Sequence, residues 1–306
     1  MARHDRGDPG AGSLPAKYPG TFMLAFREAL ATLGWQFQRW QGDLVQCADE
    51  SGDEHTIGLE NIYRRCRREP RKEWPAVVAE FLKAVGAADD PKSVPENLAA
   101  VADRLLVRIG PPLHVGGDAK VWSRQLGDTG LFANLVIDFP DRMAYVTEEL
   151  VTNSGRPGTE WLDRALANLR DKSPPDCLKV IDDDTGLHAS NAGDSYDSSR
   201  ALILDTLLPE FAADGCFAAL PSRDQLFVLP VNRAAMAHVH LLKVVALKEY
   251  QSTPYAISDE VFWVRGGVWQ LFPIKIEGKQ VTIEPPPDFI EVLERLNPAG
   301  DDDALA

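Results

Sequence analysis

The sequence lacks the long apolar runs and leader segments that direct a chain into a membrane or out of a cell. Among its 306 residues, no run approaches the roughly 18 consecutive apolar residues that a membrane-spanning helix needs. Residues 1–20 carry basic side chains but no apolar segment behind them, as a secretory signal would require. We therefore expect a cytoplasmic protein that is neither exported nor inserted into a membrane.

Cysteine is scarce and scattered along the chain. No C-x-x-C pair occurs, and no histidine stands at zinc-binding spacing from any of the four cysteines, which are Cys47, Cys66, Cys177 and Cys216. A free cysteine most often behaves as a small buried apolar residue. We therefore expect four reduced, buried thiols, no disulfide framework and no structural metal site.

Common catalytic and cofactor-binding motifs are also missing. The sequence contains no P-loop, no dinucleotide-binding G-x-G-x-x-G, no G-x-S-x-G nucleophile elbow and no H-E-x-x-H zinc motif. No cofactor is expected, and these familiar enzyme classes lose their usual support. An unfamiliar enzyme stays open, although a non-catalytic role is favoured.

Positive charge is in short supply, because 32 lysines and arginines oppose 46 aspartates and glutamates and leave a net charge of −14. A field of this sign repels nucleic-acid phosphates and anionic lipid head groups. Nucleic acid and membrane surfaces are thus disfavoured as partners, and another protein is the expected one. Apolar residues make up 44% of the chain, which is enough for a folded core.

The length suits two domains better than one. Residues 1–17 and 297–306 are rich in glycine, proline or aspartate and have no apolar period, so both are expected to be disordered tails. A polar segment with a proline at residues 87–92 reads as a linker. The expected domains are a small α+β module at residues 18–88 and a larger α+β domain at residues 93–296.

The small module is predicted to contain one helix, a small antiparallel sheet and a helical pair. Gly34 ends the first helix, as a glycine after a helix commonly does, and Pro70 interrupts the pair. The expected ranges are 22–33 for the first helix, 35–57 for the sheet, and 59–69 and 73–85 for the helical pair.

The larger domain shows a repeated order of two short strands, a turn and a helix. The three ββα units are expected at 131–138, 143–147 and 159–169, at 178–182, 187–190 and 197–211, and at 217–220, 226–231 and 234–250. Thr159 is expected to cap the first of these helices. A closing meander over residues 261–283 and a helix at 288–296 follow. Strands joined by tight turns pair antiparallel, so the fold class is α+β and not a doubly wound parallel sheet.

Three stretches of the larger domain carry a family resemblance. They are WLDRALANLR at residues 161–170, GDSYDSSRAL at 193–202 and LPSRDQLFVLPV at 220–231. In order and spacing they resemble the YtpQ-like family of uncharacterised bacterial proteins, and a weaker likeness extends over residues 20–275. The resemblance implies a cytoplasmic protein of unknown function, and it brings no activity and no catalytic residues.

Acidic and hydroxyl side chains are densest over residues 182–200. The candidate ligand or anion site in this segment consists of Asp182, Asp184, His188, Asp194, Tyr196, Asp197 and Arg200, accompanied by Asp183 and Asn191. These side chains could bind a divalent cation or supply the acid and base of a hydrolytic step. An EF-hand alignment fails, because glycines fall at the fifth and twelfth positions of the loop.

Two non-catalytic interpretations of the same segment remain. In the first, which we favour, aspartate and glycine close a hairpin, and Asp194 or Asp197 caps the helix that follows. In the second, the N–H groups at the start of that helix, together with Arg200, receive an anionic group from a ligand or partner.

A basic run contrasts with the acidic remainder of the chain and could grip a phosphate or an acidic partner. It consists of Arg64, Arg65, Arg67, Arg68, Arg71 and Lys72. A solvated helix face is the favoured interpretation.

His238 and His240 stand two residues apart in a segment that is predicted to be helical. This spacing places them on different faces of a helix, so no metal pair is expected there. His55 and His114 have no ligand-spaced neighbours.

The function expected from these features is that of a non-catalytic interaction or adaptor protein. The alternative is a metal-assisted hydrolase, or another enzyme, that uses the polar segment 182–200.

Overall fold

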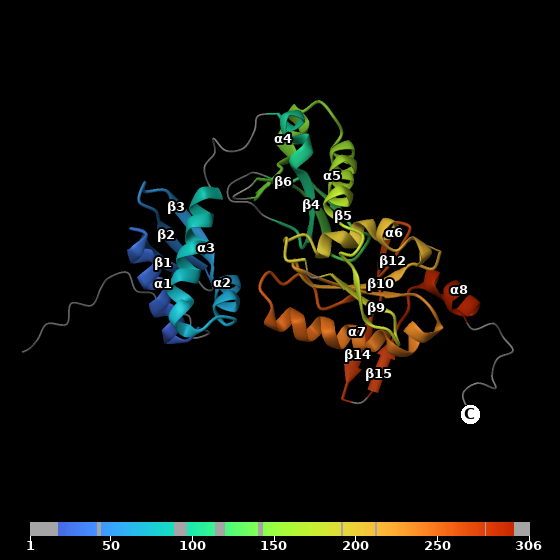
Figure 1. Ribbon diagram of the computed structural model, residues 1–306. Helices are drawn as coiled ribbons and strands as arrows, with labels where there is room; N and C mark the ends of the chain where they lie inside the picture. Colours follow the sequence, from blue (N-terminus) through green and yellow to red (C-terminus); the bar gives the residue numbers. More distant parts are fainter. Residues whose placement is uncertain are drawn as a thin grey trace, which may run out of the picture. The chain divides into compact units, whose positions relative to one another are not determined.

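The protein is described here by a computed structural model (Figure 1). The described residues are 18–41, 44–88, 97–113, 120–139, 143–190, 192–211, 213–278 and 280–296. Both expected tails, residues 89–92 of the expected linker, His114 and Asn191 lie outside these ranges. The chain divides into two compact units, Met1–Val94 and Pro95–Ala306, while the domain boundaries drawn from the sequence stay predictions.

The first unit is a three-stranded antiparallel sheet with helices. Its elements are α1 (Gly20–Thr32), β1 (Gln36–Gln41), β2 (Leu44–Ala48), β3 (Glu54–Gly58), α2 (Leu59–Cys66), η1 (Arg71–Glu73) and α3 (Trp74–Ala88), with strand order β1-β2-β3. After α1 the chain turns at Gly34, whose φ of 69° is a value that glycine adopts without strain. The buried side chains of α1, α2, α3 and the sheet form a single apolar core.

The second unit begins with a small antiparallel sheet. Its strands are β4 (Leu105–Gly110), β5 (Ser123–Gln125), β6 (Phe132–Asp138) and β7 (Met143–Tyr145), and β6 pairs with each of the other three. The helical segments are η3 (Leu98–Arg104), α4 (Glu148–Asn153) and α5 (Gly158–Lys172). Helix α5 packs on β4, and the Asn168 side chain donates to the carbonyls of Ala102 and Leu105 at 2.8 Å each.

A six-stranded antiparallel sheet forms the rest of the second unit's framework. The strands run in the order β13 (Val268–Leu271), β12 (Val261–Arg265), β10 (Cys216–Ser222), β11 (Gln225–Pro230), β9 (Leu187–Ser190) and β8 (Lys179–Asp182). Successive side chains of a strand point to opposite faces. On β10 this alternation sends Cys216, Ala218 and Leu220 to one core, and Phe217 and Ala219 to another.

The two faces of this sheet are covered by different elements (Figure 1). Helices α7 (Arg233–Ser252) and α8 (Pro287–Leu296) pack on the face of Phe217, next to the hairpin β14 (Ile274–Glu277) and β15 (Gln280–Ile283). The other face packs against α5, the β4–β6 sheet and the segments η4 (Ser198–Ile203) and α6 (Leu204–Leu207), which η5 (Pro209–Phe211) follows. Among the described residues, no helix has both the length and the apolar character needed to cross a membrane.

The α+β class with antiparallel sheets is confirmed, whereas the finer expectation of three repeated ββα units is not. The β6–β7 pair belongs to a different sheet from the β8–β9 and β10–β11 pairs. After β9, the single helix expected at residues 197–211 is wrong, because η4, α6 and η5 form three short pieces there. Thr159 lies inside the first turn of α5 and does not cap it, since Pro157 holds the cap position.

Candidate functional site

The structure separates the polar segment 182–200 into two groups. Asp182, Asp183 and Asp184 are exposed at the β8–β9 turn, where the Asp182 carboxylate accepts from the backbone N–H of Asp184 at 3.3 Å and from the Thr185 hydroxyl at 2.6 Å. This is turn chemistry, as expected. These three aspartates take no part in the second group, which surrounds Arg200.

His188 also lies apart from Arg200. Its side chain is buried on β9, its Nδ1 lies 2.7 Å from the Gly186 carbonyl oxygen, and its ring meets Phe211 edge-on at 6.4 Å. The carbonyl accepts from Nδ1–H, which fixes the tautomer. His188 is therefore a hydrogen-bonded core histidine.

Arg200 is the centre of the second group, and its side chain is only 1% exposed. Its Nη1 and Nη2 donate to the two carboxylate oxygens of Asp194 at 3.0 and 2.7 Å, a two-point geometry that suits a guanidinium. Its Nε donates to the Ser173 hydroxyl at 3.1 Å, and Nη1 also reaches Asp197 at 3.4 Å. The guanidinium therefore donates its hydrogen bonds to groups inside the protein.

Asp197 is completely buried and accepts four hydrogen bonds. Besides Arg200, its carboxylate accepts from the Ser190 hydroxyl and from the backbone N–H groups of Ala192 at 2.7 Å and Gly193 at 3.0 Å. A carboxylate has about four lone-pair positions, so these four bonds leave little capacity for a metal ion. Asp197 holds the cap position of η4, but the expectation that its side chain caps this helix is wrong, because the carboxylate accepts from no backbone N–H of η4 and holds the preceding loop instead.

Tyr196 extends this network to the other sheet. Its hydroxyl donates to Asp138 on β6 at 2.9 Å, and Lys172 pairs with the second oxygen of Asp138 at 3.2 Å. Arg108 and Lys172 each lie 5.4 Å from the centre of the Tyr196 ring. Burial, followed by the negative charge of Asp138, raises the pKa of Tyr196, so the phenol stays protonated.

The electrostatics of the network favour fixed charges. Burial by itself would raise the pKa of Asp194, but the hydrogen bonds and positive charge of Arg200 outweigh it and hold that pKa below its usual value. The anion-binding interpretation loses its donors, because the N–H of Ser198 donates to the Arg223 carbonyl at 3.1 Å and that of Ser199 to the Tyr196 carbonyl at 3.0 Å. Within the described residues, no group of three or more histidine, cysteine or acidic side chains could hold a metal ion.

A hollow beside this network is lined in part by Cys177, Ser190 and Phe227, but not by Asp194, Asp197 or Arg200. The network joins β9, α5 and β6, and it resembles a structural junction more than a reaction site.

The basic run in the first unit is partly neutralised by its surroundings. Arg64 pairs with Glu60 at 2.7 Å, one turn away on α2, and Arg65 with Glu80 at 3.4 Å. The Arg71 guanidinium lies 6.0 Å from the centre of the Trp74 ring. Arg67, Arg68 and Lys72 are exposed. This arrangement supports the solvated-face interpretation, because nearby acids already compensate two of the arginines.

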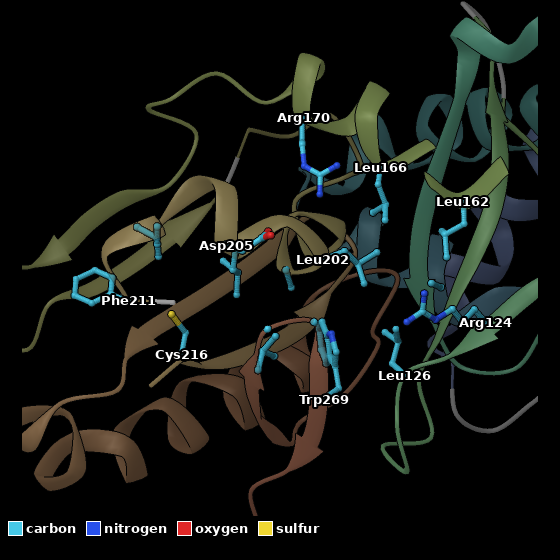
Figure 2. A pocket seen from close by; sticks show the side chains of 18 residues that line it. Arg124, Leu126, Leu162, Leu166, Arg170, Leu202, Asp205, Phe211, Cys216 and Trp269 are labelled. Carbon is cyan, nitrogen blue, oxygen red and sulfur yellow. The ribbon is translucent and has the colours of Figure 1, made fainter. Parts of the chain in front are cut away.

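An apolar cleft in the second unit was not anticipated from the sequence (Figure 2). It has a volume of about 230 Å³, and its walls come from β5, α5, η4, α6 and the β12–β13 hairpin. Six leucines line it, together with Phe211 and Trp269, while Arg124, Arg170 and Asp205 supply the charge. The lining residues are spread between positions 124 and 269, and the one local signal is the spacing of Leu162, Leu166 and Arg170 at four-residue steps on α5.

Comparison of the chain with protein-family models, with curated proteins and with solved structures finds no match. The candidate sites are therefore interpreted from their own chemistry alone.

Proposed function

We propose that this chain is a non-catalytic interaction protein that binds a partner protein through the outward face of α7. The observation that carries the proposal is an apolar stripe on that helix. Leu241, Val244 and Leu247 are 47%, 46% and 39% exposed, respectively. At roughly 100° per residue, Val244 lies opposite the side of α7 that Val239 and Leu242 bury against the sheet. Apolar side chains grouped on one exposed face are typical of protein-binding surfaces.

The charge of this face indicates the kind of partner. The outward half of α7 carries Arg233 and Lys248 and no carboxylate, although the whole chain has a net charge of −14. Glu249 lies on another side of the helix, where it accepts from Gln225 at 2.8 Å. An amphipathic helix with acidic residues beside its apolar side complements this surface. A second copy of the chain that docks through its own α7 face would place like charges against each other.

The alternative function, a metal-assisted hydrolase or another enzyme, has less support. Its required acid, base or metal ligand would have to come from Asp194, Asp197 or Arg200, whose hydrogen-bonding groups are already engaged with one another. We also propose that the chain is a member of the YtpQ-like family and lies in the cytoplasm, because the sequence features described above support both.

The proposal is tested with the full-length protein and a double variant, Leu241→Ser/Val244→Ser. Both side chains are exposed, so folding should be retained. Partners are captured from native lysate, identified by mass spectrometry, and titrated as purified proteins. We expect one stoichiometric partner with an acidic amphipathic helix, and at least a roughly tenfold loss of affinity in the double variant.

The matched control is Ile290→Ser on α8, which removes a side chain of similar exposure from a different helix and should leave affinity unchanged. Lys248→Glu should weaken binding mainly at low salt, because exposed charges act at long range. A set of captured proteins that is identical for wild type and double variant would refute the proposal. So would self-association of the chain through α7 with no other partner, as measured by sedimentation.

A further inference from the structure

The apolar cleft beside η4 has the composition of a ligand site. Leu126, Leu162, Leu166 and Leu202 line it, with the Trp269 ring on the side of the β12–β13 hairpin (Figure 2). Protein interiors normally fill such space with side chains, because unfilled apolar volume forfeits contacts. An unfilled apolar cleft that is open to solvent therefore favours an apolar occupant.

The size of the cleft limits the occupant. A cavity of roughly 150 Å³ is enough for benzene, so about 230 Å³ takes on the order of nine non-hydrogen atoms. A saturated chain of about eight carbons or a substituted single ring has this size, whereas a long-chain lipid or a dinucleotide does not.

Three glycines line the cleft on the side of β10 and β12. Gly215 has a φ of 79°, and a Cβ at this position would come within 2.3 Å of the Val264 carbonyl oxygen. Gly266 and Gly267 form the adjoining turn and also line the cleft without side chains. Three lining positions thus contribute no side-chain volume.

Two arginines indicate the charge of the occupant. Arg124 on β5 is exposed and forms no ion pair with any described residue. Arg170 on α5 donates its Nε to the Thr206 hydroxyl at 3.1 Å, and no described side chain accepts from its Nη groups. In Figure 2 the Arg170 guanidinium points toward the cleft from above Leu202 and Asp205. Among the residues that line the cleft, two arginines therefore stand against one carboxylate, Asp205, although the whole chain is strongly acidic.

Nothing in the cleft suggests covalent chemistry. The only nucleophilic candidate in its lining is the Cys216 thiol, and burial, followed by the charge of Glu210, raises the pKa of this thiol to about 12. A thiol of that pKa is neutral at physiological pH and is a weak nucleophile. The cleft therefore has binding features without a reactive group.

From these features we propose that the cleft binds a small amphipathic carboxylate, with a medium-length apolar body against the leucines and the carboxylate at Arg124 and Arg170. A planar guanidinium with free Nη groups pairs with a carboxylate at two points. This site is independent of the α7 surface, so either proposal can fail without the other.

The experiment titrates the full-length protein with two probes of equal length by calorimetry, and follows the methyl signals of the cleft leucines by NMR. Octanoate supplies both the apolar body and the charge, while 1-octanol supplies the body alone. We expect saturable binding of octanoate with a Kd below about 1 mM, shifts confined to the cleft methyls, and weaker binding of octanol. Acetate, which has the charge without the body, should not bind.

Variants separate the two contributions. Arg124→Gln/Arg170→Gln should weaken octanoate binding about five- to tenfold and leave octanol binding unchanged, because only the charged interaction is lost. Leu166→Trp, which fills the cleft, should weaken both probes. Arg104→Gln, an exposed arginine elsewhere in the second unit, is the matched control and should change neither.

Since the substituted arginines are exposed, their loss should not unfold the protein, and thermal melting of each variant checks this. The proposal is overturned if octanoate shows no saturable binding up to about 5 mM, or if the double arginine variant binds octanoate as well as the wild type does.

Discussion

Two neighbouring regions of the second unit use the same short segment in opposite ways. Arg200 on η4 is enclosed in the polar network, whereas the next two residues, Ala201 and Leu202, line the apolar cleft. In the network, the hydrogen-bonding groups of Asp194, Asp197 and Arg200 are engaged with one another and with their neighbours. In the cleft, side chains do not fill the apolar space, and the two arginines form no ion pair with any described residue. The contrast teaches that a dense cluster of polar residues marks a structural junction when it is saturated, while unmatched groups are better indicators of binding.

The sharpest test of this contrast is Arg200→Met, which should lower the free energy of unfolding by about 3–5 kcal/mol. The substitution leaves Asp194 and the fully buried Asp197 without their positive partner. Urea unfolding followed by circular dichroism measures the change. In the exposed turn, Asp183→Ala should change stability by less than about 0.5 kcal/mol. A loss below about 1 kcal/mol in the Arg200 variant would contradict the junction interpretation.

A second test uses pH and should show a somewhat smaller effect. The pKa of Asp194 is lower in the folded protein than the usual value near 3.9. Its contribution to stability is therefore present above about pH 4 and is lost as the pH falls through the folded-state pKa. Asp194→Asn should lower stability at pH 7 by about 1.5–3 kcal/mol, the range for a hydrogen bond to a charged group.

The same variant should also show a shallower decline in stability than the wild type below pH 4. Urea titrations between pH 7 and pH 3 measure both effects. Parallel pH curves for the two proteins would mean that Asp194 does not carry this dependence.

A third test compares packing on the two sides of the cleft wall. Ala201 lines the cleft and Ala218 on β10 lies in the core behind it, and both are almost fully buried. Ala218→Val should cost about 1–3 kcal/mol because it overpacks the core, whereas Ala201→Val should cost less than about 1 kcal/mol because the cleft has room. Thermal unfolding of the two variants provides the comparison. Equal losses would indicate that the cleft is closed in solution.

The smallest expected effect belongs to the arginines of the cleft. Arg124→Gln and Arg170→Gln should each change the free energy of unfolding by no more than about 0.5 kcal/mol, because exposed arginines contribute little to stability. A loss above about 1.5 kcal/mol in urea unfolding would mean that these arginines are structural, as Arg200 is.

Much of the fold could be predicted because local signals were strong. The helical period of α1 ends at Gly34, and tight turns predict the antiparallel pairing of the hairpins β8–β9, β10–β11 and β12–β13. Strand β4 was missed because its side chains are buried on both faces, which removes the alternation that identifies a strand. The sequence expectation of one helix at residues 197–211 failed since tertiary contacts, such as the bond from the Ile109 N–H to Ser199, override local propensity.

The polar residues around Arg200 could be found from the sequence, but their hydrogen-bond partners could not. The Arg200 Nε donates to the Ser173 hydroxyl, and the Ser190 hydroxyl is one of the donors to the Asp197 carboxylate. Nothing in the sequence next to Arg200 or Asp197 indicates that these hydroxyls lie within hydrogen-bond distance in the fold. The cleft could not be predicted at all, because its walls meet only after the two sheets pack. Apolar residues that line it look the same in sequence as those that fill the core.

The rate at which the four buried thiols are alkylated can report how often each part of the chain opens. Cys47 and Cys66 lie in the first unit, and Cys177 and Cys216 lie in the second. Because burial raises the pKa of each thiol, an alkylating reagent must wait for the surrounding structure to open before it meets a thiolate. Each unit contains two of these thiols. The order in which the thiols react would therefore show which unit opens more readily, and no label has to be added to the native protein.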